Sequence, residues 1–372
     1  MRIRILQVNK YYSPWIGGIE KIVQYISEGF SDGCFSMRVL CCNTKRVTSY
    51  EQEKDIFITR ASSFGRFQGL PLSISFFFYF KKYIEQTDII VLHHPFPLAD
   101  LALLLFRPKK DIIVYYHADI IKRKIYTILF EPILQHTLRA AKKIVISHSS
   151  LLTSRTLRYH REKCVVIPFC TDTKKNRESS SEEKVCSLQR TYGRFVLFVG
   201  RLVPYKGLSY LISAVKYAPY NLVIIGEGPL EKSLRKLVRS EGLMEKVYFL
   251  PHQEEINLIQ YYHAAEVFVL PSVLKNESFG IVLIEAMAAG CPLISTELGT
   301  GTSYINEHGV TGFVIKPKDF FSLGRALSLL HHDDITRIQM GVEAKKRVES
   351  EFKKEHMLSG YRDIFESCMS EV

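Results

Sequence analysis

Two glutamates eight residues apart, Glu277 and Glu285, mark the segment of this sequence with the clearest chemical pattern. Glu277 precedes the apolar run Phe279–Ala289, for which we expect a helix, and Glu285 lies inside that run. A carboxylate in an apolar helix is costly to bury without a partner, and a hydroxyl group of a ligand can be that partner. An ion pair inside the protein is the alternative. We favour a site that binds hydroxyl groups.

Two cations stand together in the run Phe198–Gly207. Arg201 follows a strand-like segment that ends in glycine, and Lys206 comes five residues later, just before an expected helix. Cations at a helix entry can bind a diphosphate, arginine through its planar fork and lysine as a point charge. A solvated loop would not need this spacing, so we predict an anion site.

Three glycine-containing turns also follow expected strands. Gly17 and Gly18 come after the first strand and can let the backbone approach a phosphate at a helix N-terminus, although a plain turn would read the same way. Gly228 belongs to the turn Gly226–Pro229, which by itself is only a tight turn before a helix. The segment Gly299–Ser303 offers small residues and backbone N–H groups that suit an anion.

His117 follows the expected strand Ile112–Tyr116. It is either a core histidine or a site residue. Because ligands of open α/β sheets bind at the carboxyl ends of the strands, its position favours the site.

The elements that position these residues alternate between short β-branched runs and helical stretches. In the first half we expect helices at about 19–31, 71–86, 123–139 and 149–159. The expected strands of that half are Ile3–Val8, Arg38–Cys42, Asp55–Thr59, Ile89–Leu92, Ile112–Tyr116, Ile144–Ser147 and Val165–Ile167. A second series follows at Phe195–Val199, Leu222–Ile225, Val247–Leu250, Val267–Leu270, Leu293–Ser295 and Phe313–Ile315. This alternation predicts two doubly wound, parallel α/β domains in tandem, joined by a polar linker between Thr171 and Arg190.

Composition narrows the class of protein. With 372 residues and 47% hydrophobic content, the chain can bury a large core. No apolar run approaches the roughly 18 residues of a membrane-spanning helix, and the N-terminus lacks the pattern of an export signal. The eight cysteines show no CxxC spacing, which is typical of reduced cytosolic thiols.

The net charge of +12 is uneven along the chain. Residues 1–190 carry 30 Lys and Arg against 17 Asp and Glu, whereas residues 191–372 carry 20 against 21. Basic clusters recur in the first half, and an aromatic stretch from Phe64 to Phe80 runs directly into Lys81-Lys82. Basic proteins can simply be soluble, but this combination favours a helix at an anionic lipid surface.

Taken together, these segments resemble the retaining glycosyltransferases of family 4, also called group 1, which have the two-domain GT-B fold. The resemblance spans nearly the whole chain, and the Glu277 and Glu285 pair with Phe279-Gly280 between them is its most specific element. It implies two Rossmann-like domains facing across a cleft. Residues 1–172 would be the acceptor domain, 173–192 the linker and 193–352 the nucleotide-sugar donor domain, with a C-terminal helix at 353–372 packing back on the first domain.

The resemblance also implies roles for single residues. Glu285 would hold the nucleotide ribose and Glu277 a hydroxyl of the donor sugar, while Arg201 and Lys206 would neutralise the diphosphate. The remaining donor contacts would come from Gly17, Gly18, Gly228, Phe279 and Gly280. His117 would sit beside the sugar and the acceptor, and Leu250–His252 would border the base. The catalytic set is then His117, Glu277, Arg201 and Lys206.

The loop after the last of these segments departs from the family pattern. The usual Gly-Gly-x-x-Glu is replaced by Gly299–Ser303, which leaves one contact to the sugar undefined. The variant looks like that of bacterial polysaccharide mannosyltransferases. It favours GDP-mannose as donor, with UDP-sugars next, and a lipid-linked or lipopolysaccharide glycan as acceptor in lipopolysaccharide, O-antigen or exopolysaccharide synthesis. We therefore expect a cytoplasmic protein, peripheral on the inner face of the cell membrane.

The expected mechanism needs neither a metal nor another cofactor. No Asp-x-Asp occurs in the chain, so Arg201 and Lys206 must neutralise the diphosphate. The resemblance implies that the acceptor attacks from the face that the diphosphate leaves and that the leaving phosphate takes the acceptor proton, which retains the anomeric configuration.

Other classes fit the sequence less well. A nucleotide-binding oxidoreductase would need a GxGxxG after a strand, and none is present. We expect no nucleic-acid partner, because the basic half contains no recognised nucleic-acid-binding module. A sugar-nucleotide epimerase or a phosphorylase of the same architecture is the closest rival.

Overall fold

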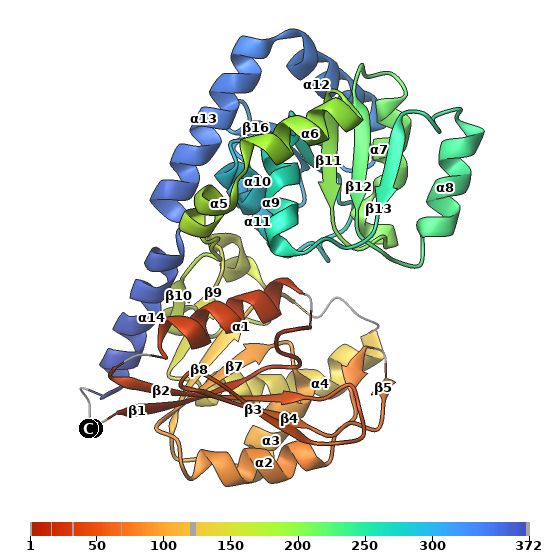
Figure 1. Cartoon of the computed structure of the whole chain (residues 1–372). Coiled ribbons are helices and arrows are strands. Elements are labelled where there is room, and N and C mark those ends of the chain that lie inside the picture. Colours follow the sequence, from red (N-terminus) through yellow and green to blue (C-terminus); the bar gives the residue numbers. More distant parts are fainter. Residues whose placement is uncertain (1, 16, 32, 68, 120–123, 370–372) are drawn as a thin grey trace. The chain divides into compact units, whose positions relative to one another are not determined.

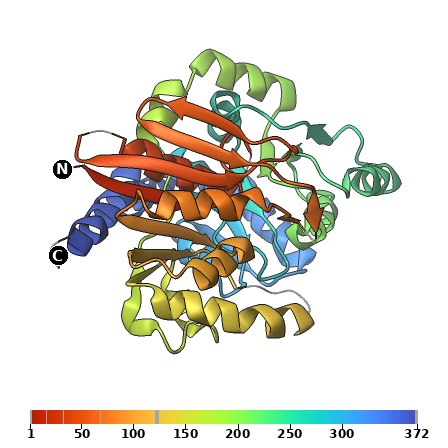
Figure 2. The ribbon, with the colours of Figure 1, turned by 90° about the horizontal axis from the view of Figure 1, so that it is seen from below.

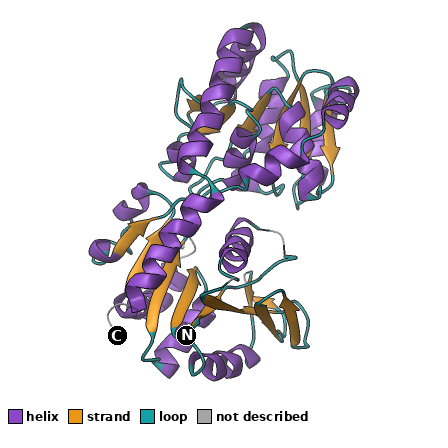
Figure 3. Ribbon diagram, turned by 60° about the vertical axis from the view of Figure 1, so that its left-hand side comes forward, coloured by secondary structure: helices purple, strands orange, loops and turns teal. Residues whose placement is uncertain are grey.

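The computed structural model describes residues 2–15, 17–31, 33–67, 69–119 and 124–369. They form two compact units, one made of Met1–Pro168 with Glu355–Val372 and the other of Phe169–Lys354 (Figure 1). The chain therefore passes from the first unit to the second once and returns for its last helix. Each unit has a central sheet with helices packed on it (Figure 3).

The first unit contains an eight-stranded sheet in the order β10-β9-β8-β7-β1-β2-β4-β3. Its strands are β1 (Ile3–Val8), β2 (Phe35–Cys42), β3 (Ser49–Glu53), β4 (Ile56–Ala61), β7 (Ile89–His94), β8 (Asp111–Tyr116), β9 (Lys143–Ile146) and β10 (Cys164–Val166). All neighbours pair in parallel except β3 and β4. The expectation of a wholly parallel sheet is thus wrong at this edge, where the exposed sequence Ser-Tyr-Glu-Gln-Glu lacks the β-branched signal of a buried strand.

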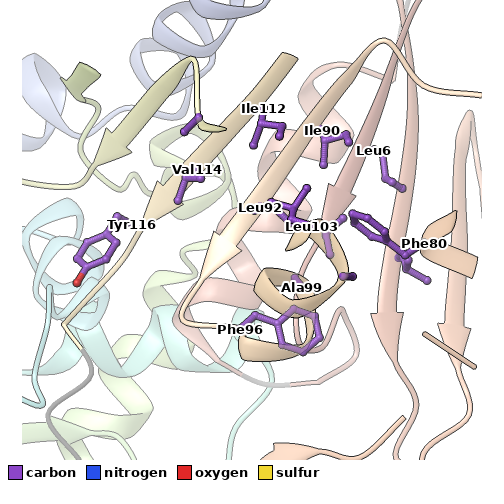
Figure 4. Packing of buried hydrophobic residues seen from close by; sticks show 14 of the residues in the cluster. Leu6, Phe80, Ile90, Leu92, Phe96, Ala99, Leu103, Ile112, Val114 and Tyr116 are labelled. Carbon is purple, nitrogen blue, oxygen red and sulfur yellow. The ribbon is translucent and has the colours of Figure 1, made fainter. Parts of the chain in front are cut away.

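The two faces of this sheet are covered by different helices (Figure 2). One face packs against α2 (Ser75–Ile84), α3 (Pro97–Phe106) and α4 (Lys124–Ala140), and Figure 4 shows part of that core around Leu6, Leu92, Phe80 and Leu103. Residues of opposite parity, such as Gln7 in β1 and Tyr115 in β8, face the other side, where α1 (Gly18–Gly29) and α14 (Lys354–Met369) pack. The period of two in a strand explains this division.

Three local expectations in the first unit need correction. Helix α3 was not among the expected helices, although Pro97 at its first turn and the left-handed Arg107 after it mark both ends. The expected helix at 149–159 is instead the short 3₁₀ turn η1 (Ser149–Thr153), followed by η2 (Arg161–Lys163). Within the aromatic stretch, Phe76 and Phe80 are fully buried, so only part of it can face a lipid surface.

The second unit contains a six-stranded, wholly parallel sheet in the order β13-β12-β11-β14-β15-β16. Its strands are β11 (Phe195–Val199), β12 (Asn221–Ile225), β13 (Val247–Leu250), β14 (Val267–Leu270), β15 (Leu293–Thr296) and β16 (Gly312–Ile315). Its helices are α7 (Leu208–Val215), α8 (Glu231–Ser240), α9 (Glu255–Ala264), α10 (Ile281–Ala288), α11 (Gly301–Ile305), α12 (Phe320–His332) and α13 (Asp334–Glu351). The sequence located all six strands, with only small differences at their ends.

The segment expected to be a linker forms two helices, α5 (Thr173–Ser179) and α6 (Glu182–Tyr192), and clusters with the second unit. Asp172 and Ser181 cap them by accepting hydrogen bonds from the backbone N–H groups of Lys175 and Lys184. The side chain of Gln260 in α9 then bridges the junction between the two helices. The polar composition concealed these helices because α6 buries none of its side chains.

Helix α14 belongs to the first unit, although it is last in the chain. The ring of Phe365 lies 5.1 Å from that of Phe30, and the ring of Tyr361 lies 5.7 Å from that of Tyr115. In the part of the chain that the structure describes, no helix combines the length and apolar character needed to cross a membrane.

Both sheets have a point where the strand order reverses. The chain builds outward from β1 in one direction, through β2 to β4 and β3, and then from β7 in the other. In the second sheet, the reversal lies between β11 and β14. Open α/β sheets bind ligands beside the carboxyl ends of the strands at such points.

Candidate functional site

The loops after β11 and β14 pack backbone against backbone at the reversal point of the second sheet. Gly207 has a φ of +68°, and a Cβ atom there would lie 2.1 Å from the carbonyl oxygen of Pro271. The N–H of Val273 donates a hydrogen bond of 2.7 Å to the carbonyl of Tyr205. These contacts bring Lys206 of one loop beside Glu277 of the other.

Lys206 and Glu277 form a buried ion pair. The Lys206 Nζ atom lies 2.5 Å from Oε2 of Glu277, and each residue is only 7% exposed. The Ser272 hydroxyl donates a further hydrogen bond of 2.8 Å to the same carboxylate oxygen. The internal ion pair, which was the alternative for this segment, is therefore present for Glu277. It joins two of the residues expected to bind the donor.

Arg201 lies on the same loop as Lys206 but is exposed. Among the described residues, no acidic side chain forms an ion pair with its guanidinium, in contrast to Lys206. The loop that carries Arg201 packs closely against Gly228, where a Cβ atom would lie 2.4 Å from the carbonyl oxygen of Leu202. The structure thus gives Gly228 a packing role, and its contact to a donor remains a prediction.

Glu285 lies on α10, which starts two residues later than expected because Gly280 caps it with a φ of +87°. The Tyr262 hydroxyl of α9 donates a hydrogen bond of 2.9 Å to Oε2 of Glu285. Burial, and then the charge of Glu285, raise the pKa of Tyr262 well above its usual value. Tyr262 therefore stays a donor and fixes one edge of the Glu285 carboxylate.

The backbone around Phe279 and Gly280 is supported by the loop after β15. The Gly301 N–H donates a hydrogen bond of 2.8 Å to the carbonyl of Ser278, and a Cβ atom on Gly301 would lie 2.6 Å from Cα of Phe279. The N–H groups of Gly299 and Ser303 are also hydrogen-bonded within the loop, to Glu297 and Thr300. The expectation that these amides would receive an anion is wrong for these three groups.

In the first unit, Gly17 caps α1 and Gly18 is its first residue. A Cβ atom on Gly17 would lie 2.1 Å from Oε2 of Glu20, so the buried Glu20 carboxylate folds back onto the helix N-terminus. Burial raises the pKa of Glu20. The positive end of the helix dipole thus already has an acidic side chain beside it.

His117 follows β8 and is 2% exposed. Its Nε2 atom lies 3.1 Å from Nδ1 of His93, whose Nε2 lies 2.6 Å from Oε1 of Gln7. Burial lowers the pKa of His93 to about 3 and that of His117 well below its usual value. Both imidazoles are therefore neutral near pH 7.

Four residues around these positions were not predicted from the sequence: Gln7, His93, Tyr262 and Ser272. Each is fully or almost fully buried and contacts a predicted site residue or a neighbour of one. A signal existed for two of them, because Gln7 interrupts the apolar strand β1 and His93 stands at the carboxyl end of β7. Tyr262 and Ser272 have no such pattern.

Comparison with known proteins finds two matching family models, relatives of similar length and solved structures with a similar fold. Residues 180–347 match the family model described as glycosyl transferases group 1, and residues 16–175 match the one described as glycosyltransferase family 4. The O-antigen chain mannosyltransferase C of Escherichia coli is 32% identical over 99% of both chains. A D-rhamnosyltransferase of Pseudomonas aeruginosa is 31% identical over 94% of this chain and 92% of its own. Among solved structures, sucrose-phosphate synthase from Thermosynechococcus elongatus superposes with a TM-score of 0.85 at 18% identity, covering 100% of both chains.

Proposed function

Since the chain belongs to the group 1 glycosyltransferases of family 4, we propose that it transfers mannose from GDP-mannose to a membrane-associated glycan. The pathway would be the synthesis of O-antigen or of a related lipopolysaccharide or exopolysaccharide. The full-length similarity to an O-antigen chain mannosyltransferase carries this proposal. A UDP-sugar is the next candidate for the donor.

The geometry of the second unit supports a donor site. Glu285, whose carboxylate is oriented by the hydrogen bond from Tyr262, would accept hydrogen bonds from the ribose hydroxyls of the nucleotide. Glu277 would accept a hydrogen bond from a hydroxyl of the sugar, and the backbone at Phe279 and Gly280 would steady the sugar and phosphate. In this proposal Gly17, Gly18 and Gly228 shape the surroundings of the diphosphate.

The charges of Lys206 and Arg201 would act differently. The Lys206 ammonium has three donor hydrogens, so it can keep Glu277 and still donate to a phosphate oxygen. Because Glu277 already offsets its charge, the exposed Arg201 would supply most of the net attraction for the diphosphate. These two cations would stabilise the leaving diphosphate without a metal ion, while the phosphate takes the acceptor proton on the face where the acceptor attacks.

Ligand-dependent thermal stability tests the donor site directly. We would measure the unfolding temperature with GDP, UDP, ADP and their sugars, with and without EDTA, in the wild type, Glu285→Ala and the matched exposed variant Glu245→Ala. We expect stabilisation by the guanine series that survives EDTA, persists in Glu245→Ala and is lost in Glu285→Ala. Stabilisation by uridine compounds alone would reject GDP-mannose, and dependence on a divalent ion would reject the metal-free site.

Product analysis then tests the reaction. With GDP-mannose and a lipid-linked glycan acceptor, we expect a mannosylated product whose anomeric configuration matches that of the donor in its NMR spectrum. Conversion of the sugar nucleotide without acceptor would instead indicate an epimerase. Hydride transfer to a nicotinamide cofactor would indicate an oxidoreductase, although family membership does not favour either alternative.

A patch on the first unit supports an anionic membrane as a partner. The segment between β4 and α2 forms a small hairpin, β5 (Arg66–Phe67) with β6 (Leu70–Pro71), that leads into α2. Exposed apolar side chains recur along the hairpin and the start of α2, and basic residues flank them. The apolar members of this hairpin patch are Phe64, Phe67, Leu72, Ile74 and Phe78, and the basic members are Arg66, Lys81 and Lys82.

Apolar side chains beside lysine and arginine are the pattern of a surface that inserts shallowly into anionic lipid. We expect the protein to sediment with vesicles rich in anionic phospholipid at low salt and to be released at high salt. The double variant Ile74→Ser/Phe78→Ser should lose binding, whereas Phe321→Ser, which removes an equally exposed aromatic ring from the second unit, should not. If Ile74→Ser/Phe78→Ser bound the vesicles as well as Phe321→Ser, the hairpin patch would not be the surface that binds the membrane.

A further inference from the structure

Three buried polar side chains form a continuous chain of hydrogen bonds across the first sheet. Gln7, His93 and His117 come from β1, from β7 and from the residue after β8, which are neighbouring strands. The chain links Gln7 Oε1 to His93 Nε2 at 2.6 Å and His93 Nδ1 to His117 Nε2 at 3.1 Å. At its other end, Gln7 contacts α1 through Ser27 and Val23.

The contacts at the Gln7 end of this chain of hydrogen bonds determine which atom is the donor in each of them. The Val23 carbonyl can only accept, and the Ser27 hydroxyl donates its own proton to that carbonyl at 2.8 Å. Toward Gln7 both groups can therefore only accept, and its amide nitrogen lies 3.1 Å from Ser27 Oγ and 3.4 Å from the Val23 oxygen. The Gln7 amide is thus oriented with its oxygen toward His93.

An amide oxygen only accepts, so His93 must carry its proton on Nε2. A neutral imidazole has one proton, and burial keeps His93 neutral, which leaves its Nδ1 as an acceptor. His117 must then donate through Nε2. Since His117 is also buried and neutral, its Nδ1 carries a lone pair and acts as an acceptor.

We propose that Gln7 and His93 are positioning residues that lock His117 in the Nε2–H tautomer, so that His117 accepts a hydrogen bond from a substrate hydroxyl through Nδ1. This inference rests on the proposed function, in which His117 lies beside the sugar and the acceptor. It adds a chemical restriction, because an acceptor nitrogen cannot serve a phosphate oxygen that also only accepts. His117 would therefore accept a hydrogen bond from a sugar hydroxyl rather than neutralise the diphosphate.

Nitrogen NMR of the protein labelled with ¹⁵N-histidine tests the tautomer without any substrate. Signals would be assigned with His93→Gln and His117→Gln. In the wild type between pH 6 and 8, we expect both residues to show a protonated Nε2 and an unprotonated Nδ1. A cationic His117, or one protonated on Nδ1, would overturn the proposal.

The variant Gln7→Glu should reverse the direction of the hydrogen bond between His93 and His117. A carboxylate accepts from His93 and stabilises its cation, whose Nδ1–H would then donate to His117 Nε2. His117 must in turn move its proton to Nδ1, which is visible in the same spectrum. An unchanged His117 tautomer in the folded variant would show that Gln7 does not control it.

Transfer kinetics connect the tautomer to activity. We expect Gln7→Glu to lower kcat/KM roughly tenfold, the size expected for one lost hydrogen bond to a hydroxyl. The matched control is Gln260→Met, which removes a buried, hydrogen-bonded glutamine from the second unit and should leave both kcat/KM and the His117 tautomer unchanged. Equal losses of kcat/KM in both variants would mean that Gln7 contributes only to the stability of the fold.

The source of the hydroxyl is resolved by the same kinetics. If it belongs to the donor, Gln7→Glu should raise the KM for the sugar nucleotide or lower kcat with every acceptor. If it belongs to the acceptor, the loss should vanish with an acceptor analogue that lacks that hydroxyl. A wild type with the predicted tautomer but no glycosyl transfer would refute the proposed function alone, because the NMR result does not depend on it.

Discussion

The buried pair of Lys206 and Glu277 shows how one contact can serve both stability and binding. Each side chain is needed by the other in the ligand-free protein, and each is also a predicted donor contact. A buried charge that loses its partner is strongly destabilising, whereas removal of both charges often costs little. The two roles can therefore be separated by a double-mutant cycle.

We predict that Lys206→Met lowers the free energy of unfolding by about 3 kcal/mol, because among the described residues Glu277 would keep only the Ser272 hydroxyl as a side-chain partner. The double variant Lys206→Met/Glu277→Leu should be more stable than Lys206→Met alone, yet still fail to bind donor. Denaturant unfolding and nucleotide titration measure the two effects. Additive losses of stability would mean that the ion pair is not coupled in solution.

The buried histidines make stability depend on pH. The pKa of His93 is about 3 in the folded protein and 6.5 in an ordinary environment, so the unfolded chain binds the proton more tightly. Its stabilising effect is complete above pH 6.5 and is lost as the pH falls toward 3. We predict that the free energy of unfolding decreases below pH 6.5, with a slope of up to about 1.4 kcal/mol per pH unit from His93 alone.

The variant His93→Gln should make this slope shallower. The exposed histidine variant His252→Gln gives a matched control, because an exposed imidazole need not be desolvated on folding. Denaturant titrations between pH 4 and 7.5 compare the three proteins. The same slope in all of them would mean that His93 is hydrated or charged in solution.

At the residue scale, the sequence predicted the groups that stand just after strands, because the carboxyl edge of a parallel sheet is a known place for ligands. Lys206 and Glu277 were found in this way and do lie together. The pairing of Tyr262 with Glu285 could not be predicted, since it joins two helices whose relative rotation is set by packing. The link from Gln7 to His93 likewise depends on which strands are neighbours.

At the scale of elements, the loop Gly299–Ser303 acts as a support for the start of α10. Gly301 has an ordinary φ, so its lack of a side chain matters only because Phe279 and Ser278 lie so close. Gly299 in the same loop has a φ of +63° and open space around it. The two glycines are therefore required for different physical reasons.

We predict that Gly301→Ala displaces the backbone at Phe279 and weakens donor binding, with a loss of stability of roughly 1–3 kcal/mol from overpacking. Gly299→Ala should cost about 1 kcal/mol from its left-handed conformation and leave donor binding unchanged. Nucleotide titrations of both variants, with thermal unfolding, separate the two effects. Equal nucleotide affinity in both variants would show that the loop Gly299–Ser303 does not support the donor site.

The sequence predicted the elements with strong apolar periodicity, but it did not predict those whose position depends on capping residues or on a single neighbouring element. All six strands of the second sheet were located because they read as apolar runs, and the four inner strands are almost entirely buried. The polar segment 173–192 was misread as a linker because side-chain caps and packing on α9 determine α5 and α6. The edge strand β3 was missed because β4 alone pairs with it.

At the scale of the whole molecule, the chain has the GT-B fold that the sequence resemblance implied, with two Rossmann-like units. The first unit is discontinuous, since its last helix follows the entire second unit in the chain. Tyr361, Phe365 and Cys368 of α14 are fully buried, and a Cβ atom on Gly29 would lie 2.4 Å from Leu358. The first unit therefore cannot complete its core until the last residues of the chain are available.

We predict that deletion of residues 355–372 unfolds the first unit and leaves the second folded. Phe30, Phe35 and Tyr115 would lose the aromatic neighbours that bury them, and a single Phe365→Ala should already cost about 3–5 kcal/mol. The neighbouring exposed variant Glu366→Ala should be nearly neutral. Because Lys206, Glu277 and Glu285 all lie in the second unit, the truncated protein should still be stabilised by the donor nucleotide while transferring no sugar. A truncated protein that retains the full calorimetric unfolding enthalpy of the wild type would show that α14 is dispensable for the first unit.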